Sequence, residues 1–591
     1  MQTRRMHRRL FAAAVAALIA AMVPLTAQNR APQSTSDIPK IQFEKYALPN
    51  GLEVILSEDH RLPIVTANLW YHVGPANEAA GRTGFAHLFE HLMFQGSKHT
   101  PHDSHFQMLE AAGATGINGT TDYDRTNYFE TVPSNRLELA LWIESDRMGY
   151  LLDAIDEKEF ANQQDVVRNE RRQSVENRPY GNAEEELVHM LYPQNHPYYA
   201  SVIGSHADIQ AAKLEDAREF FKRYYAPNNA SIAIVGDFDA AATKKLVEKY
   251  FGPLKRGAAV PAINVQTPKI TMEQRKVVPD RIELPRVYMA WLTPSIFKPG
   301  DAEAIIASEI LGGGRASRLY QKLVYEKQIA QNVEAYQQSL LLGSQFQIDA
   351  TARPGHTAEE LEQAINEEVE LLRARPVEQR EIDQARNTIE TQTIGRLENL
   401  NGVANMLNEY NHFLKTPDYL QKDIERIRAV TPASLMAFAR EQLQPNGRAV
   451  VYAVKGTPEL GPQTPTPPAP TTAGTGTESV NVDEAWRTEI PKPGPAKALQ
   501  VQVPETAQLA NGLTVILSTR RGLPIVAANL VVKSGSDTNP ADAPGLANFT
   551  VSLLDQGTAT RSAVQIANQV AQLGATPVSY THLTLPTILR V

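Results

Sequence analysis

The chain has 591 residues, which is too long for one domain of ordinary size and predicts three or four modules. Hydrophobic residues make up 42% of it and charged residues 21%, which excludes a disordered, a collagenous and a polytopic membrane protein. A net charge of −8 without a lysine-rich tail argues against a nucleic-acid partner. Because there is no cysteine, any metal must be held by His, Asp or Glu.

The first 27 residues have the pattern of a secretory signal peptide. Four arginines precede an apolar run from Leu10 to Val23, which Pro24 ends. The run is short for a bilayer span of about 20 residues, but it suits the core of an export signal. We therefore expect residues 1–27 to be removed, no stable membrane span to remain, and the protein to be periplasmic or secreted. The alternative is an uncleaved anchor.

The elements that follow alternate between strand and helix patterns. Residues 46–56 predict a strand, a hairpin turn at Asn50-Gly51 and a second strand. The apolar run from Ile64 to Val73 predicts a further strand, and the periodicity between Arg82 and Gln95 predicts a helix. These elements together indicate an α+β protein.

The helix predicted between Arg82 and Gln95 carries a metal-binding pattern. Its apolar side chains share one face: Phe85, Leu88, Phe89, Leu92 and Met93. His87 and His91 are four residues apart, so they lie one turn above each other and can reach one ion. Zinc suits two imidazoles and a carboxylate because a fourth position stays open for water, and Glu90 can take a proton from that water. The alternative is a pair of structural histidines on a packed helix.

A third protein ligand is needed, and spacing alone does not choose it. Four carboxylates lie in or beside the next helical segment: Glu157, Glu159, Glu170 and Glu176. Glu170 follows the pair Val166-Val167 by three to four positions, which predicts that it faces the buried side. We expect the other three to be exposed to solvent or to contact the metal ligands without binding the metal themselves.

Two further patterns are predicted to carry no site. His99, His102 and His105 follow the metal-binding helix, but their polar, Pro-containing setting predicts a solvated loop. The run Gly312-Gly-Gly is not a phosphate loop, because no Gly-Lys-Ser/Thr follows it.

An internal repeat of the first part of the sequence begins after a linker. Residues 456–500 are rich in Pro, Thr and Gly and predict an extended linker. Beyond it, residues 509–518 repeat residues 48–57 at an offset of 461. Two complete halves would need about 920 residues. The ending from about Val578 abandons the repeat and resembles translated adapter read-through, so we expect residues 578–591 to be an artefactual tail.

The second copy lacks the metal-binding pattern. Asn548, Val551 and Ser552 stand where the first copy has its two histidines and the glutamate between them, and none of the three can bind zinc. We therefore expect residues 501–577 to be the start of an inactive second half that is truncated in this chain.

The metal-binding pattern resembles that of a known family. His87-x-x-Glu90-His91, followed 79 residues later by Glu170 after Val-Val-x-Asn, resembles the inverted zincins of the pitrilysin/insulysin family, relatives of mitochondrial processing peptidase. The resemblance covers essentially the whole mature chain. It implies that His87, His91 and Glu170 bind one zinc ion per chain and that Glu90 is the general base.

The resemblance also has implications for the fold and for substrate binding. It implies repeated subdomains with mixed, largely antiparallel sheets packed with helices: a catalytic subdomain over 43–205, and a non-catalytic one over 206–455 that is entered through the strand Ala230–Gly236. Asn118, Gly119 and Thr120 would lie in an edge strand to which an extended peptide adds. The alternative for that segment is an ordinary surface hairpin.

The expected function is zinc-dependent endopeptidase cleavage of unfolded peptides or small proteins. One alternative is a non-catalytic peptide-binding or core subunit of a processing-peptidase-like assembly, although such a subunit has no need of the intact set His87, Glu90 and His91. Another is a zinc-dependent hydrolase of non-peptide substrates. The sequence leaves open the cleavage preference and whether the protein is a homo-oligomer.

Overall fold

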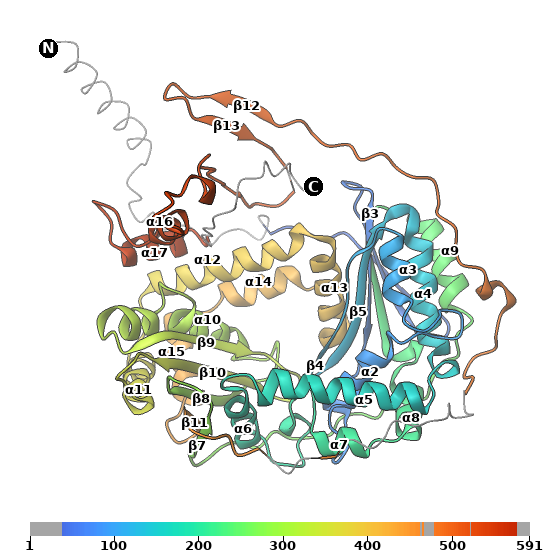
Figure 1. The fold of residues 1–591 in the computed structure, drawn as a ribbon, viewed down its shortest axis with the longest axis horizontal. Helices are drawn as coiled ribbons and strands as arrows, with labels where there is room; N and C mark the ends of the chain where they lie inside the picture. Colours follow the sequence, from blue (N-terminus) through green and yellow to red (C-terminus); the bar gives the residue numbers. More distant parts are fainter. Residues whose placement is uncertain (1–37, 461–463, 466–477, 521, 576–591) are drawn as a thin grey trace. The chain divides into compact units, whose positions relative to one another are not determined.

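The structure is a computed structural model that describes residues 38–460, 464–465, 478–520 and 522–575. Two large sheets packed with helices make up most of it (Figure 1). The predicted signal peptide and the predicted tail from Val578 lie outside the described residues. No described helix is both long enough and apolar enough to cross a membrane.

The first sheet has six strands in the order β1-β2-β6-β3-β5-β4. They are β1 (Glu44–Ala47), β2 (Glu53–Glu58), β3 (Ile64–Tyr71), β4 (Thr115–Asp122), β5 (Arg125–Pro133) and β6 (Ala230–Gly236). Neighbouring strands are antiparallel except β2 and β6. The hairpin predicted at Asn50-Gly51 is present, and Gly51 has a φ of 98°, a left-handed conformation that glycine adopts without steric cost.

Helices cover both faces of this sheet (Figure 1). Val54 and Leu56 of β2 belong to a core with helices α4 (Leu137–Tyr150) and α9 (Ala240–Phe251). Ile55, between them, packs against α13 (Leu400–Leu414) on the opposite face. Burial on both faces explains why the central strands read as apolar runs rather than as alternating patterns.

The second sheet, with five strands, repeats the strand order of the first without a counterpart of β1. It has the order β7-β11-β8-β10-β9, with its parallel pair, β7 and β11, at the same place as β2 and β6. Its strands are β7 (Gln274–Asp280), β8 (Arg286–Thr293), β9 (Ala330–Gln338), β10 (Ser344–Ala352) and β11 (Arg448–Lys455). The prediction of an α+β protein with repeated subdomains and largely antiparallel sheets is confirmed.

The remaining helices join and cover these sheets. In the first subdomain they are α2 (Phe85–Leu92), α3 (His105–Ala111), α5 (Glu157–Arg171), α7 (His206–Ala211) and α8 (Leu214–Tyr224). Helix α6 (Gly181–Leu191) follows α5 in the chain but packs against β7, β8 and β11 of the second sheet. In the second they are α10 (Asp301–Gly312), α11 (Ala358–Ala374), α12 (Gln379–Gly395), α14 (Leu420–Arg428) and α15 (Pro432–Gln442).

One strand lies in a different sheet from the one expected. The family resemblance implies that Ala230–Gly236 belongs to the second subdomain, but it is β6, a central strand of the first sheet between β2 and β3. The reason is a long-range pairing, in which Glu53 of β2 lies opposite Ser231 of β6. The first structural unit therefore extends at least to the end of α9 at Phe251.

Part of the predicted linker is an ordered strap on the first subdomain. The Asn481 side chain donates to the carbonyl of Gly149 at 2.7 Å. Arg487 is fully buried and donates to Ser145 Oγ at 3.0 Å. These contacts anchor residues 481–487 to α4, and Lys497 farther on binds Asp237 at 2.7 Å, although the Pro-rich composition predicts an extended spacer.

The second copy of the first hairpin forms with little burial. Its strands β12 (Glu505–Gln508) and β13 (Thr514–Leu517) make a separate two-stranded sheet. Leu52 and Ile55 are 0% exposed in the first copy, whereas their counterparts Leu513 and Ile516 are 43% and 68% exposed. Apolar surface left in water forgoes about 25 cal/mol for each Å². We therefore predict that the chain from about residue 500 folds poorly.

Candidate metal centre

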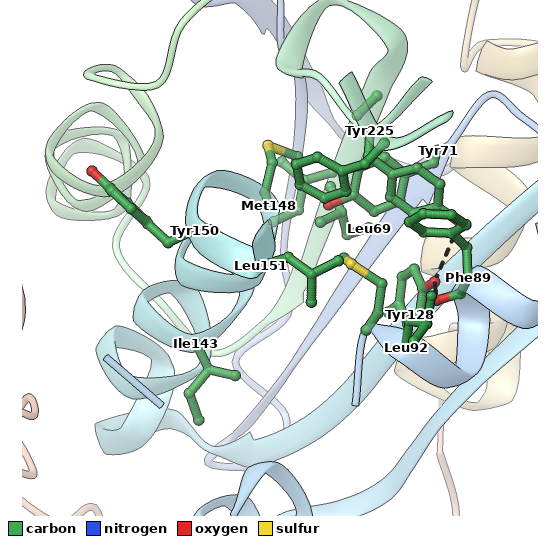
Figure 2. Packing of buried hydrophobic residues seen from close by; sticks show 14 of the residues in the cluster. Leu69, Tyr71, Phe89, Leu92, Tyr128, Ile143, Met148, Tyr150, Leu151 and Tyr225 are labelled. Atoms are coloured by element: carbon green, nitrogen blue, oxygen red, sulfur yellow. Dashed lines mark hydrogen bonds between the residues drawn. The ribbon is translucent and has the colours of Figure 1, made fainter. Parts of the chain in front are cut away.

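Helix α2 turns its apolar face inward and its metal-binding pattern outward. Phe89 and Leu92 pack into the aromatic core of the first subdomain, where the Tyr128 hydroxyl donates to the carbonyl of Phe89 at 3.4 Å (Figure 2). The side chains of His87 and His91 are 13% and 24% exposed. The histidines are therefore held by a packed helix while their rings remain within reach of a ligand.

A buried carboxylate holds the start of α2. Glu78 accepts hydrogen bonds from the backbone N of Gly84 at 2.9 Å and of Ala86 at 2.8 Å. These bonds satisfy amides that the first turn of a helix leaves without partners. Burial raises the pKa of Glu78 to about 7. Sequence reasoning missed Glu78, because only the folded loop brings it back to the helix that it caps.

Helix α5 brings the third candidate ligand to α2. Glu170 Oε2 lies 3.2 Å from His91 Nε2 and 3.8 Å from His87 Nε2. One ligand atom from each residue lies within 4.8 Å of the others, and among the described residues this is the one such group of three. Ligand atoms bound about 2.1 Å from a tetrahedral zinc ion lie about 3.4 Å apart. The donor set therefore fits zinc.

The other three carboxylates lie elsewhere. Glu157 is exposed at the start of α5. Glu159 contacts His102 at 2.5 Å, and Glu176 contacts His206 at 2.6 Å. Of the four candidates that the sequence leaves open, Glu170 alone is placed beside the two histidines of α2.

Packing and an ion pair set the end of α5. Val167 is fully buried, but Val166 is 40% exposed, so the expected pair does not share one buried side. Glu170 follows the buried Val167 by three positions, but its side chain is 42% exposed rather than buried as predicted. Next to it, Arg171 forms two hydrogen bonds with Glu185, at 2.7 and 2.8 Å. This bidentate pair fixes the helix end from which Glu170 projects.

Glu90 lies outside the group of three candidate ligands, close enough for the charges of His91 and Glu170 to act on its carboxyl. Thr121 Oγ1 of β4 donates to Glu90 Oε2 at 2.7 Å. A Cβ atom at Gly119 would lie 3.0 Å from Glu90 Cγ, so the glycine lets β4 approach α2 closely. Burial raises the pKa of Glu90, and the hydrogen bond from Thr121 partly offsets this effect. The contacts of β4 thus orient Glu90 and engage one of its two oxygens.

The surroundings of His87 and Glu170 favour the protonation states in which these side chains can bind a metal ion. Burial, and then the charge of His91, lower the pKa of His87 to about 4, so its imidazole is neutral. The hydrogen bond with His91 lowers the pKa of Glu170, which keeps this carboxyl ionised. Neutral imidazole and ionised carboxylate are the forms that bind a metal ion.

The predicted substrate-binding residues lie on the outer strand of the first sheet. Asn118, Gly119 and Thr120 belong to β4, which is the last strand in the sheet order and pairs only with β5 among the described strands. Asn118 is exposed and Gly119 is buried against α2. The structure thus places an unpaired strand edge next to Glu90.

The prediction of a solvated loop for the three histidines after α2 is wrong for two of them. The His99 side chain is 5% exposed and contacts Asp146 at 2.6 Å. His105 is 2% exposed and packs edge-on against Phe94. His102 is 47% exposed, as expected. The difference arises because the partners of His99 and His105 come from elements that the local sequence does not reveal.

The copy of α2 in the second half is α16 (Leu546–Leu553). It carries Asn548, Val551 and Ser552 at the positions of the metal-binding pattern. None of these three residues belongs to the one group of candidate metal ligands found among the described residues.

Two family models match the chain. The model described as Insulinase (Peptidase family M16) matches residues 53–206 and again residues 514–584, which supports the predicted repeat and extends past Val578. The model described as Peptidase M16 inactive domain matches residues 211–389. The candidate metal ligands all lie in the first of these matches.

The chain is also similar in sequence and fold to known peptidases. Zinc protease PqqE of Helicobacter pylori is 30% identical over 380 residues, covering 64% of this chain and 84% of the relative. A crystal structure of a protease from Helicobacter pylori aligns with a TM-score of 0.67 and 27% identity, covering 71% of this chain and all of that one. The periplasmic protease PqqL from Escherichia coli shares the fold, with a TM-score of 0.60 and 17% identity over 82% of this chain and 56% of that one. The chain therefore belongs to the insulinase family of peptidases, peptidase family M16.

Proposed function

We propose that the chain is a zinc-dependent endopeptidase that cleaves unfolded peptides or small proteins. The observation that carries this proposal is the convergence of His87, His91 and Glu170 within 4.8 Å, with the carboxylate of Glu90 beside them and outside their group. Membership of a peptidase family and the names of the relatives support it. The words "inactive domain" belong to the match at 211–389, which contains none of these residues.

Each of the four residues has one task in the proposed reaction. A zinc ion, when bound, supplies a Lewis acid that polarises the peptide carbonyl and makes water more acidic. His87 and His91 hold it from α2, and Glu170 holds it from α5. Glu90 takes a proton from the attacking water and gives it to the leaving amine. Thr121, 2.7 Å from Glu90 Oε2, keeps this carboxylate oriented during both transfers.

The proposed substrate class follows from the free edge of β4. An extended peptide can add to such an edge by main-chain hydrogen bonds, which places its backbone beside Glu90. A folded protein rarely offers an unpaired extended segment, so unfolded peptides are the fitting substrates. The signal-peptide pattern of residues 1–27 supports a periplasmic or secreted location.

Removal and return of the metal test this proposal. An internally quenched, unstructured peptide is incubated with the full chain before and after treatment with a zinc chelator. We expect hydrolysis to be lost on chelation and restored by about one equivalent of zinc per chain, because the described residues form one ligand group. Hydrolysis that survives complete removal of zinc would contradict the mechanism, and zinc binding without any hydrolysis would favour a peptide-binding subunit.

A further inference from the structure

A cavity of about 390 Å³ lies beside the edge strand β4, on the face of the first sheet that is turned away from α2. Trp70 and Phe129 of the sheet and Phe413 of α13 form apolar parts of its wall. Thr120 of β4 also lines it, whereas the next residue, Thr121, donates to Glu90. The cavity and Glu90 therefore lie on opposite faces of the same short stretch of β4.

A peptide paired with β4 would present side chains to both faces. Successive side chains of a strand point to opposite faces of the sheet. In β4, Gly119 and Thr121 face α2, while Thr120 and Asp122 face the cavity. A strand added beyond β4 continues the same alternation. Every second side chain of the bound peptide would then point toward the side of the cavity.

Arg125 is a cation of the cavity whose hydrogen-bond acceptors are all neutral. Its guanidinium donates to Thr120 O at 2.9 Å and to Asn127 Oδ1 at 3.0 Å, both neutral acceptors, and packs over the ring of Trp70. It lies within ion-pair distance of no acidic residue that the structure describes, although the charges of Asp122, Glu409 and Asp124 in the cavity wall act on it from farther away. A half-buried guanidinium with only neutral partners is well suited to bind a carboxylate.

The other charged groups of the cavity are engaged. Glu409 pairs with Arg396 at 2.5 Å. Asp124 accepts from the backbone N of Leu341 at 2.9 Å. Asp122 lies opposite Arg125 in the hairpin register, but its carboxylate accepts from the backbone N of Tyr123 at 2.7 Å. Of the two guanidinium groups that line the cavity, Arg396 is paired with Glu409, and Arg125 is the one without an ion pair among the described residues.

We propose that Arg125 and this cavity form a subsite that selects an acidic side chain of the bound peptide; this inference rests on the proposed function. The guanidinium extends from β5 to Thr120 of β4. A strand added to β4 lies about 4.8 Å farther on, a distance that the side chain of Glu or Asp can span. The preferred residue lies on the face of the peptide that points away from Glu90.

Matched peptides test the subsite with the full, zinc-loaded chain. The peptides differ only in carrying Glu, Gln or Lys at successive positions around one scissile bond. At one position we expect Glu to exceed Gln by about tenfold in kcat/KM, the scale of one charge-assisted hydrogen bond. We expect Arg125→Gln to bring that ratio to about one and Arg125→Glu to reverse it in favour of Lys. The control Arg61→Gln, at an exposed ion pair with Asp59, should keep the wild-type ratio.

Peptide binding separates this inference from the proposed function. Fluorescence anisotropy of labelled Glu and Gln peptides with the zinc-depleted chain needs no catalysis. Tighter binding of the Glu peptide that Arg125→Gln removes supports the subsite, even where no peptide is hydrolysed. A Glu preference that survives Arg125→Gln, an equal loss of binding for both peptides, or no preference at any position overturns it.

Discussion

The Glu90→Gln variant is expected to lose about 10³-fold in peptidase kcat, the scale of a missing general base, while still binding about one zinc ion per chain. Glu90 lies outside the group formed by His87, His91 and Glu170, so its loss removes no candidate ligand. The amide oxygen of glutamine can still accept the hydrogen bond from Thr121, so the local packing is preserved. An amide cannot accept the proton of the attacking water.

The measurement combines steady-state kinetics on a quenched peptide with metal analysis of the same sample. Glu110→Gln is a matched control, because Glu110 is an exposed glutamate on the neighbouring helix α3. It should keep wild-type kcat. A Glu90→Gln variant that retains most of its activity, or that loses its zinc, contradicts the role proposed for Glu90.

The second large effect is expected for Glu170→Gln, which should weaken zinc binding by about 10–100-fold or more. Its carboxylate is the one that lies 3.2 Å from His91 Nε2 and 3.8 Å from His87 Nε2. A neutral amide oxygen is a poorer ligand for zinc than an ionised carboxylate. Competition with a chromogenic zinc chelator measures the affinity.

Two glutamates that the sequence leaves as alternatives serve as controls. Glu157 is exposed at the start of the same helix, and Glu176 contacts His206. Glu157→Gln and Glu176→Gln should both keep the wild-type affinity for zinc. Unchanged zinc content and activity in Glu170→Gln would show that the third ligand has been misplaced.

Local patterns were sufficient to predict much of the first subdomain. The turn at Asn50-Gly51, the strand that begins at Ile64 and helix α2 each depend on residues that are close in sequence. The position of β6 could not be predicted in this way, because it results from the pairing of Glu53 with Ser231 across the subdomain. The strap at 478–497 depends on single anchors such as Arg487, which composition does not reveal.

In the candidate site, too, the features set by local sequence could be predicted, and those set by contacts between distant elements could not. The spacing of His87 and His91 predicts one helical face without any knowledge of the fold. Its place after Val166-Val167 and the resemblance both favour Glu170, but only the fold separates it from the other three carboxylates. The contacts of Thr121 with Glu90 and of Glu78 with the start of α2 join separate elements, so no local pattern indicates them.

Anomalous X-ray scattering from crystals of the zinc-loaded protein, measured on both sides of the zinc absorption edge, tests the central claim most directly. The structure predicts one strong peak per chain among His87 Nε2, His91 Nε2 and Glu170, about 2.0–2.2 Å from each ligand atom, with Glu90 outside the coordination sphere. The absence of a peak there, or a zinc ion held by Glu90 or by other residues, would contradict it.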